Sequence, residues 1–509
     1  MPRSTVFLMA FAVCCFSTPA SAARVDGKLT LRVLDKQTGL PIPVRMELRN
    51  GRGRPVRVRA EGVITHDDYF VFDGQVTLKL RKGPYEFLIE AGPEYQTRPG
   101  HFTIERRAED STEITLERRV DMQAEGWWAG DLDVRQRTQD LPLLMRATGV
   151  NLAPIFVREN VQGRCQQEKH PEKLIEQYFG TIHLGPRYAL DHRRGGGLLV
   201  YDEAGTKKPL RICQLKPDAS SLAVSQSDND TEATLIALTP FAWDLPLWIA
   251  AGKLDAIQII HRHALADDVV DNEGWGRKRD KTFFPGKTGN GRWSETIYHH
   301  LLNCGLRIPP AAGSGSGANK NSVGTNRVYV HCGEDFSRES WFAGLREGKV
   351  IVTNGPLLRT EVSGHPPGHQ FQLDAGESRD FQIALGLAFY EKAPVEYLEI
   401  VKNGRVVHEI RLGELAKKQG RLPALNFDSS GWFLVRAMTS TTKNYQFATT
   451  GPYYVESNYQ PRISRKSVQF FLDWLDAAAV EFTDNQTVLA NIKAARPFWE
   501  DLLGKANAD

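Results

Sequence analysis

The sequence predicts a multidomain protein that combines all-β parts with an α/β part. Hydrophobic residues recur with a period of two over residues 28–118 and again over 361–456. Between these regions, short apolar runs alternate with helix-like segments. A period of two is typical of strands, and the alternation is typical of βα units. A chain of 509 residues is also too long for a single hydrophobic core.

Residues 1–23 have the composition of a cleaved secretory signal peptide. Arg3 precedes an apolar run over residues 6–16, and small residues occupy positions 20–22. The run is too short to cross a membrane as a helix, and no later segment is apolar for long enough to do so. We therefore expect an exported protein, periplasmic or extracellular, without a membrane span.

Charge and cysteine content narrow the possible partners and sites. The formal net charge is +3, which is too small to favour a nucleic-acid partner. Four cysteines follow the signal segment without any Cys-x-x-Cys spacing, so a zinc ribbon is not expected. They are Cys165, Cys213, Cys304 and Cys332. Disulfides are possible in an exported protein, but the sequence gives neither their pairing nor the oligomeric state.

The N-terminal region, residues 24–119, is expected to be a β-sandwich. Its apolar alternation is broken by turn residues at 35–39 and 82–84, and no helical stretch intervenes. Residues 38–44 resemble the opening of carboxypeptidase-regulatory-like sandwiches. Domains of that type usually support a neighbour, so we assign no chemistry to this one.

The central region, residues 120–360, is expected to form an α/β barrel or an open α/β sheet. Strand-like runs are found at 151–157, 198–201, 235–238, 256–260 and 328–330, and helix-like runs at 141–147, 245–251 and 295–303. The polar segment 216–230 reads as a surface loop. The segment 309–326, rich in Gly and Ser, is either a flexible linker or a loop of the functional face.

The C-terminal region is expected to hold a second β-domain, residues 361–460, and a helical tail, residues 461–509. The pair Asn403-Gly404 between two apolar runs predicts a tight hairpin. In the tail, apolar residues recur at helical spacing, and either Ser464 or Ser467 is placed to cap the first helix.

Candidate metal ligands occur at the ends of two expected strands. Asp131 and Asp133 are two residues apart, so they share one face of a strand. That spacing suits a metal site and equally suits a buried structural pair. His261 and His263 have the same spacing, and two imidazoles at a strand end can hold Zn²⁺ or Mn²⁺.

Several stretches of the central region resemble the CehA/McbA-type metallohydrolases of the PHP superfamily. These are residues 126–132, 141–147, 240–248, 272–277, 305–317 and 352–357. The resemblance implies a PHP-like distorted (β/α) barrel over residues 120–360, with divalent metal ions at its mouth. It further implies hydrolysis of phosphoesters or carbamate esters by a metal-activated water.

This chain departs from the family pattern at the metal ligands. Family members characteristically carry a His-x-His pair directly after Gly-Asp-Leu, and here those positions are Asp133 and Arg135. An arginine cannot ligate a metal and its charge repels one, whereas its planar fork suits a carboxylate or phosphate. We predict Arg135 as a substrate-binding residue; the alternative is a replacement by drift that has no role. The metal, Zn or Mn, would have to be held by Asp131, Asp133, His261 and His263, or be absent.

Two functions follow from this departure, and no catalytic residue can be assigned for either. The first is an exported metal-dependent hydrolase with an altered ligand set. The second is a non-catalytic relative whose barrel cleft binds a small molecule, a glycan, a peptide or a partner protein. Stoichiometric metal in the purified protein would favour the first function.

Overall fold

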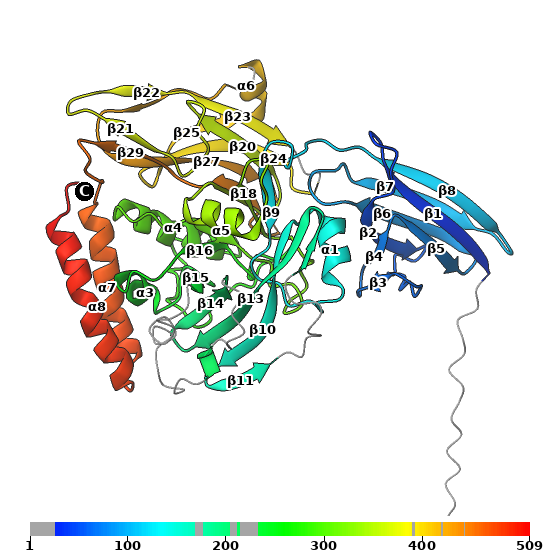
Figure 1. Cartoon of the computed structure of the whole chain (residues 1–509), viewed down its shortest axis with the longest axis horizontal. Helices are drawn as coiled ribbons and strands as arrows, with labels where there is room; N and C mark the ends of the chain where they lie inside the picture. The colour runs from blue at the N-terminus through cyan, green and yellow to red at the C-terminus, as the bar shows by residue number, and fades with distance from the viewer. Residues whose placement is uncertain are drawn as a thin grey trace, which may run out of the picture.

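The computed structural model describes residues 26–167, 177–203, 211–213, 233–388, 392–418, 421–441 and 443–509. Within these residues the protein is rich in β-strands, which form several sheets around separate hydrophobic cores (Figure 1). The coarse prediction of a β-rich multidomain protein is therefore confirmed. The predicted signal peptide at 1–23 and the predicted loop at 216–230 lie outside the described residues.

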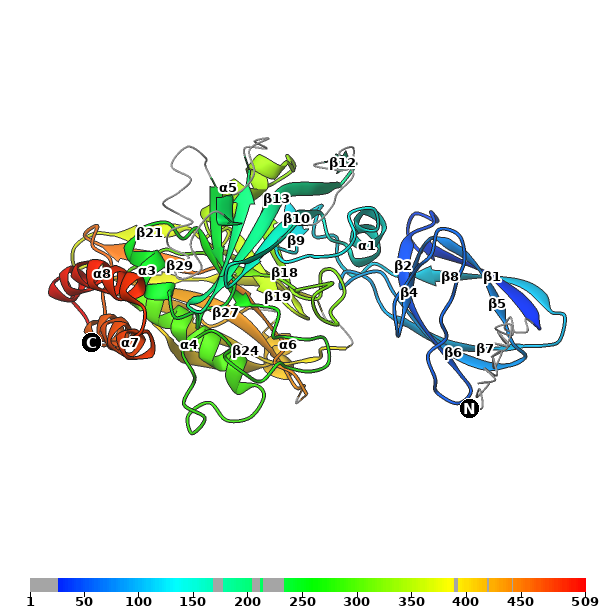
Figure 2. The same ribbon diagram turned by 90° about the horizontal axis from the view of Figure 1, so that it is seen from below.

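The N-terminal region forms two sheets that enclose one core. The first has the order β5 (Gln75–Leu80), β1 (Gly27–Asp35) and β8 (Glu109–Leu116). The second has the order β3 (Ile64–Thr65), β4 (Phe70–Asp73), β2 (Pro43–Asn50), β6 (Gly83–Glu90) and β7 (Arg98–Ile104). Buried and exposed residues alternate along β5, as the period of two predicts. Figure 2 shows this sandwich at one end of the molecule.

The central region alternates strands and helices close to the predicted positions. Its strands are β9 (Trp127–Gly130), β10 (Leu152–Val161), β11 (Arg164–Gln167), β12 (Gln177–Phe179), β13 (Ile182–Arg193), β14 (Gly196–Asp202), β15 (Ala233–Ala237), β16 (Ala256–Ile260), β17 (Pro310–Ala312), β18 (Arg327–His331) and β19 (Val350–Thr353). Its helices are α1 (Leu141–Thr148), α3 (Leu245–Ala250), α4 (Gly289–Asn303) and α5 (Arg338–Arg346).

The central sheet mixes parallel and antiparallel neighbours. Strand β10 is parallel to β9 and β13, and β16 is parallel to β15 and β17. Strand β14 is antiparallel to both β13 and β15. Only Arg194 and Gly195 separate β13 from β14, which is too short for a parallel crossover and forces a hairpin. The sheet therefore differs from a ring of parallel strands.

One disulfide joins Cys165 of β11 to Cys213, with 5.8 Å between the Cα atoms. The cysteines are 48 residues apart in the chain, so the bond ties the strand pair β10–β11 to a distant segment. Among the described residues, Cys304 is a buried thiol and Cys332 a partly buried one. The structure thus gives the pairing that the sequence leaves open.

The C-terminal β-region shares its sheet with the central region. Its strands are β20 (Leu357–Val362), β21 (Gln370–Leu373), β22 (Arg379–Phe381), β23 (Ile383–Ala388), β24 (Val395–Lys402), β25 (Arg405–Arg411), β26 (Leu425–Phe427), β27 (Gly431–Thr439), β28 (Phe447–Thr450) and β29 (Tyr453–Ser457), with helix α6 (Leu412–Lys417). Strand β19 pairs with β28, so the sheet runs across the predicted boundary at residue 360. The predicted hairpin joins β24 to β25, with positive φ angles of 51° at Asn403 and 80° at Gly404.

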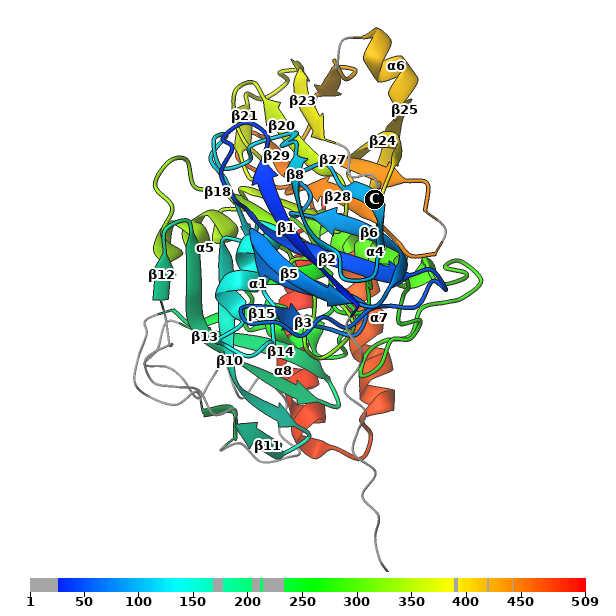
Figure 3. The same cartoon turned by 90° about the vertical axis from the view of Figure 1, so that its right-hand side faces the viewer.

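The tail consists of two helices, α7 (Arg465–Glu481) and α8 (Gln486–Gly504), as predicted. Ser464 caps α7, because its side chain accepts a hydrogen bond from the backbone N–H of Ser467. The pair packs on α3 and α4, at the end of the molecule opposite the sandwich (Figure 2). Seen from the sandwich end, the tail lies behind the central sheet (Figure 3). Among the described residues, no helix is long and apolar enough to span a membrane.

Candidate functional site

The two candidate aspartates follow the end of β9 and are fully buried. The carboxylate of Asp131 accepts hydrogen bonds from the backbone N–H groups of Ser314 (2.9 Å), Gly324 (2.7 Å) and Asp133 (3.2 Å). Burial raises the pKa of Asp131 to about 6, although these hydrogen bonds lower it. Asp131 therefore fastens the loop after β17 to the end of β9.

The segment 309–326, predicted as a linker or a functional loop, is packed against the site. A Cβ atom at Gly313 would lie 2.7 Å from the Cβ of Asp133 and 2.5 Å from the amide nitrogen of Gln258, so only glycine fits there. The amide of Asn326 donates to the backbone carbonyls of His261 (3.1 Å) and Gly313 (3.1 Å). These contacts hold the segment against the strand ends, so it is not a flexible linker.

Asp133 is paired with Arg262, which lies between the two candidate histidines. The guanidinium donates two hydrogen bonds to one carboxylate oxygen of Asp133, at 2.9 Å from Nε and 2.6 Å from Nη2. The other oxygen lies 3.4 Å from the hydroxyl of Tyr188 and 3.9 Å from Nε of Arg135. A fixed positive charge therefore already neutralises this carboxylate.

Arg135, the predicted substrate-binding residue, lies beside this pair and is partly exposed. Its Nη2 donates to Glu159 at 2.9 Å, and its guanidinium lies 4.6 Å from the centre of the Phe156 ring. Its Nε is buried and makes no hydrogen bond within the described part of the chain. Two arginines and two carboxylates therefore alternate at the strand ends.

The two histidines are engaged by other partners. His261 is buried, with its Nε2 3.0 Å from the hydroxyl of Ser294. The Nδ1 of His263 lies 3.0 Å from the carbonyl oxygen of Asn272. Burial lowers the pKa of His261 well below its usual value, and burial together with Arg262 lowers that of His263 to about 4. Both rings are therefore neutral near pH 7.

The predicted ligands lie in one region, but their arrangement does not fit a divalent metal. Asp131 accepts three backbone N–H hydrogen bonds, and Asp133 is held by Arg262. No hydrogen bond or ion pair between described residues joins either carboxylate to the ring of His261 or His263. Over the described ranges, no three His, Cys, Asp or Glu side chains are grouped as a metal site would require. The guanidinium of Arg262 occupies the position beside Asp133 where positive charge is needed.

A third histidine and an exposed tryptophan border the arginines. The ring of His192 lies 5.6 Å from that of Trp275, measured between ring centres, at an angle of 76°. Trp275 is 43% exposed and has a positive φ of 62°, an uncommon conformation for a tryptophan. The acidic loop nearby is structural, since Asp271 pairs with Arg279 and Asp268 with Lys287. Trp275 therefore presents a ring at the edge of the site.

The low pKa of His192 predicts a measurable pH effect. Burial, Arg262 and Arg135 lower it to about 4 in the folded protein, whereas the ordinary value is 6.5. As the pH falls, His192 therefore becomes protonated in the unfolded chain at a higher pH than in the folded protein. Its contribution to the free energy of unfolding is complete above about pH 6.5 and is lost as the pH falls toward 4. We expect the wild type to lose more free energy of unfolding than His192→Gln between about pH 7 and 4.5. Urea denaturation of both proteins measures this, and equal losses would contradict it.

Sequence reasoning missed Arg262, Glu159 and Tyr188. Arg262 was visible between His261 and His263, but nothing local indicates that it reaches Asp133, 129 residues away in the chain. Tyr188 lies in β13, a strand that was not predicted. A search for charged residues at every strand end would have included Glu159 and Arg262.

Comparison with known proteins adds no functional assignment. No family model and no curated protein matches the sequence. Among solved structures, a pilus 2b backbone protein of group B streptococcus is 15% identical with a TM-score of 0.16, covering 18% of this chain and 41% of that protein. The Bacillus anthracis TIE protein is 20% identical with a TM-score of 0.15, covering 23% and 20%. A Parabacteroides merdae β-glucuronidase is 9% identical with a TM-score of 0.14, covering 83% and 62%.

The chain spans less than half the length of the pilus and TIE proteins that it matches. All three TM-scores are too low to define a shared fold. The function must therefore be argued from the residues of the site.

Proposed function

We propose that this protein is an exported, non-hydrolytic relative of the CehA/McbA-type metallohydrolases that binds a small molecule or a glycan at its central site. The two hydrogen bonds that Arg262 donates to one oxygen of the buried carboxylate of Asp133 carry this proposal. The resemblance of six sequence stretches to that family supports the relationship. The signal-like N-terminus and the Cys165–Cys213 disulfide support export, because disulfides persist in oxidising compartments.

The argument against hydrolysis rests on charge and coordination. A hydrolytic metal site needs a cation with an open position where water can bind and lose a proton. In this protein, Arg262 and Arg135 supply the positive charge at Asp133 and Glu159. A guanidinium has donors only and no coordination position, so it can orient an oxygen but cannot activate a water. The site therefore keeps its charge balance without a metal.

The argument for binding rests on the groups that remain partly exposed. The side chains of Arg135, Glu159 and Arg262 are 13%, 17% and 17% exposed. Next to them are the neutral imidazoles of His192 and His263. Hydrogen-bond donors and acceptors beside the exposed ring of Trp275 suit a small polar ligand.

Metal analysis of the mature protein tests this proposal. After incubation with Zn²⁺ or Mn²⁺ and dialysis, we expect far less than one ion per chain, and no turnover of a phosphodiester or an aryl carbamate. The matched variant Asp133→His/Arg135→His/Arg262→Gln restores two imidazoles and removes the competing charge, so it should retain more metal than the wild type. Near-stoichiometric metal in the wild type that His263→Ala removes, or turnover by the wild type, would overturn the proposal.

A further inference from the structure

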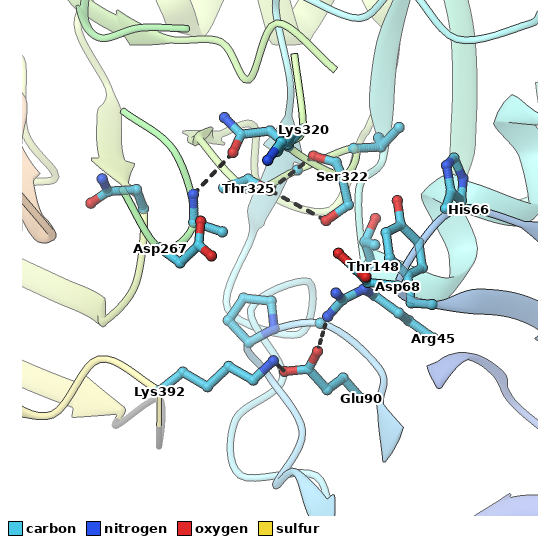
Figure 4. Close-up of a pocket in the computed structure, with 18 of the residues that line it drawn as sticks. Arg45, His66, Asp68, Glu90, Thr148, Asp267, Lys320, Ser322, Thr325 and Lys392 are labelled. Carbon is cyan, nitrogen blue, oxygen red and sulfur yellow. Dashed lines mark hydrogen bonds and ion pairs between the residues drawn. The ribbon is translucent and has the colours of Figure 1, made fainter. Parts of the chain in front are cut away.

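A cavity lies where the sandwich, the loop after β17 and the C-terminal β-region meet (Figure 4). Its volume is about 740 Å³, within the range of small-ligand sites. The sandwich contributes Arg45, His66 and Glu90, the loop contributes residues 319–325, and the C-terminal region contributes Lys392. None of the central-site arginines or aspartates lines it, but Gly324, whose N–H donates to Asp131, does, so the cavity adjoins the central site without sharing its charged residues.

One side of the cavity is charge-neutralised and carries aromatic rings. Glu90 is buried and pairs with Arg45, and with the Nζ of Lys392 at 2.9 Å. The guanidinium of Arg45 lies 4.2 Å from the centre of the Tyr69 ring, and the His66 ring is stacked on Tyr69 at 4.5 Å. This wall is therefore preorganised by ion pairs and stacking that need no ligand.

The remaining walls carry charged side chains that can still form hydrogen bonds with a ligand. The carboxylates of Asp68 and Asp267 are exposed and make neither an ion pair nor a hydrogen bond with any described residue. Lys320 likewise makes no ion pair or hydrogen bond with any described residue, although its charge acts on Asp268, and it lies near Ser322 and Thr325 in Figure 4. Asp68 belongs to the sandwich and Asp267 to the central region. A ligand bound to both would therefore bridge the two.

The balance of charges narrows the class of ligand. Basic and acidic lining residues are equal in number: Arg45, Arg49, Lys320, Arg327 and Lys392 against Glu47, Asp67, Asp68, Glu90 and Asp267. A polyanion or a polycation would meet as much repulsion as attraction here. The aliphatic lining residues are few and small, namely Pro93, Ala147, Ala266 and Val323, so a lipid would gain little burial.

We propose that this cavity binds a neutral oligosaccharide. Sugar hydroxyls donate to carboxylates such as Asp68 and Asp267 and accept from an ammonium such as Lys320. The stacked rings of His66 and Tyr69 line the cavity, and the face of an aromatic ring can pack against the C–H groups of a sugar. The volume accommodates a few sugar units.

Isothermal titration calorimetry of the full mature protein, which measures its affinity for trisaccharides, tests this inference. The probes are maltotriose, cellotriose, mannotriose and triacetylchitotriose, with trigalacturonic acid as the anionic comparison. We expect at least one neutral trisaccharide to bind, and Asp68→Asn/Asp267→Asn to weaken that binding about tenfold or more, because each carboxylate accepts charge-assisted hydrogen bonds. The control Asp268→Asn changes a neighbouring carboxylate that pairs with Lys287 outside the cavity, and it should bind as the wild type does.

Three results would overturn the inference. They are no binding of any neutral trisaccharide, tighter binding of the anionic comparison than of the neutral ones, and unchanged affinity in Asp68→Asn/Asp267→Asn. The central-site variant Arg135→Gln shows whether the trisaccharide binds in this cavity or at the central site. Affinity lost in that variant and kept in Asp68→Asn/Asp267→Asn would place the sugar at the central site instead. Thermal denaturation of each variant confirms that it is folded.

Discussion

Arg262→Ala is expected to lower the free energy of unfolding by about 3 kcal/mol, because breaking a buried ion pair leaves the other charge without compensation. Asp133 is fully buried. The Nε and Nη2 groups of Arg262 both donate hydrogen bonds to its carboxylate, at 2.9 and 2.6 Å. The nearby Arg135, at 3.9 Å, compensates only in part, which places the loss at the lower end of the expected range. Urea denaturation near pH 7 measures the effect.

A double variant distinguishes the stability lost with the ion pair from the stability lost with the packing of the Arg262 side chain. Adding Asp133→Asn to Arg262→Ala removes the stranded charge, so it should restore part of the lost stability. If Arg262→Ala instead cost less than about 0.5 kcal/mol, the pair would behave as an ordinary surface ion pair. The charge replacement on which the proposed function rests would then be contradicted.

Arg436→Ala is expected to have an effect of similar or larger size, about 3–5 kcal/mol. Arg436 of β27 is buried between Glu295 of α4, at 2.6 Å, and Glu399 of β24. The hydroxyl of Tyr445 also donates to Glu295. Removing the arginine leaves two buried carboxylates without their shared cation. Thermal and urea denaturation should both show the loss.

Two control variants test whether the buried charges cause the loss of stability in Arg436→Ala. Glu295→Gln/Glu399→Gln/Arg436→Met replaces the network by neutral groups, so it should be closer to the wild type than Arg436→Ala is. Arg411→Ala removes an exposed partner of Glu396 at the same sheet and should cost no more than about 0.5 kcal/mol. A similar loss in Arg411→Ala and Arg436→Ala would show that burial is not the reason.

Features set by neighbouring residues were predictable from the sequence. The alternation in residues 28–118 predicted the sandwich strands, and Asn403-Gly404 predicted the hairpin between β24 and β25. The helical spacing and Ser464 predicted the tail. Each of these depends on backbone propensity or on a period within a few residues, which a single sequence contains.

Features set by distant pairing were not predictable. Strand β13 was missed because charged residues interrupt its apolar pattern, and they are tolerated only because Asp191 pairs with Arg193, and Arg187 with Asp202 of β14. At the candidate site, the sequence located the residues near two strand ends but not their partners. The metal ligands, the role of Arg135 and the PHP-type barrel stay predictions for the experiments above.

The pairing of β19 with β28 bears on how this protein can be divided for study. A fragment cut near residue 360 would expose one edge of β19, with unpaired N–H and C=O groups that invite association between copies. It would also remove the strand that covers that edge. Recombinant fragments that contain the central region should therefore extend past residue 450, and precipitation of a shorter fragment would not describe the behaviour of the intact protein.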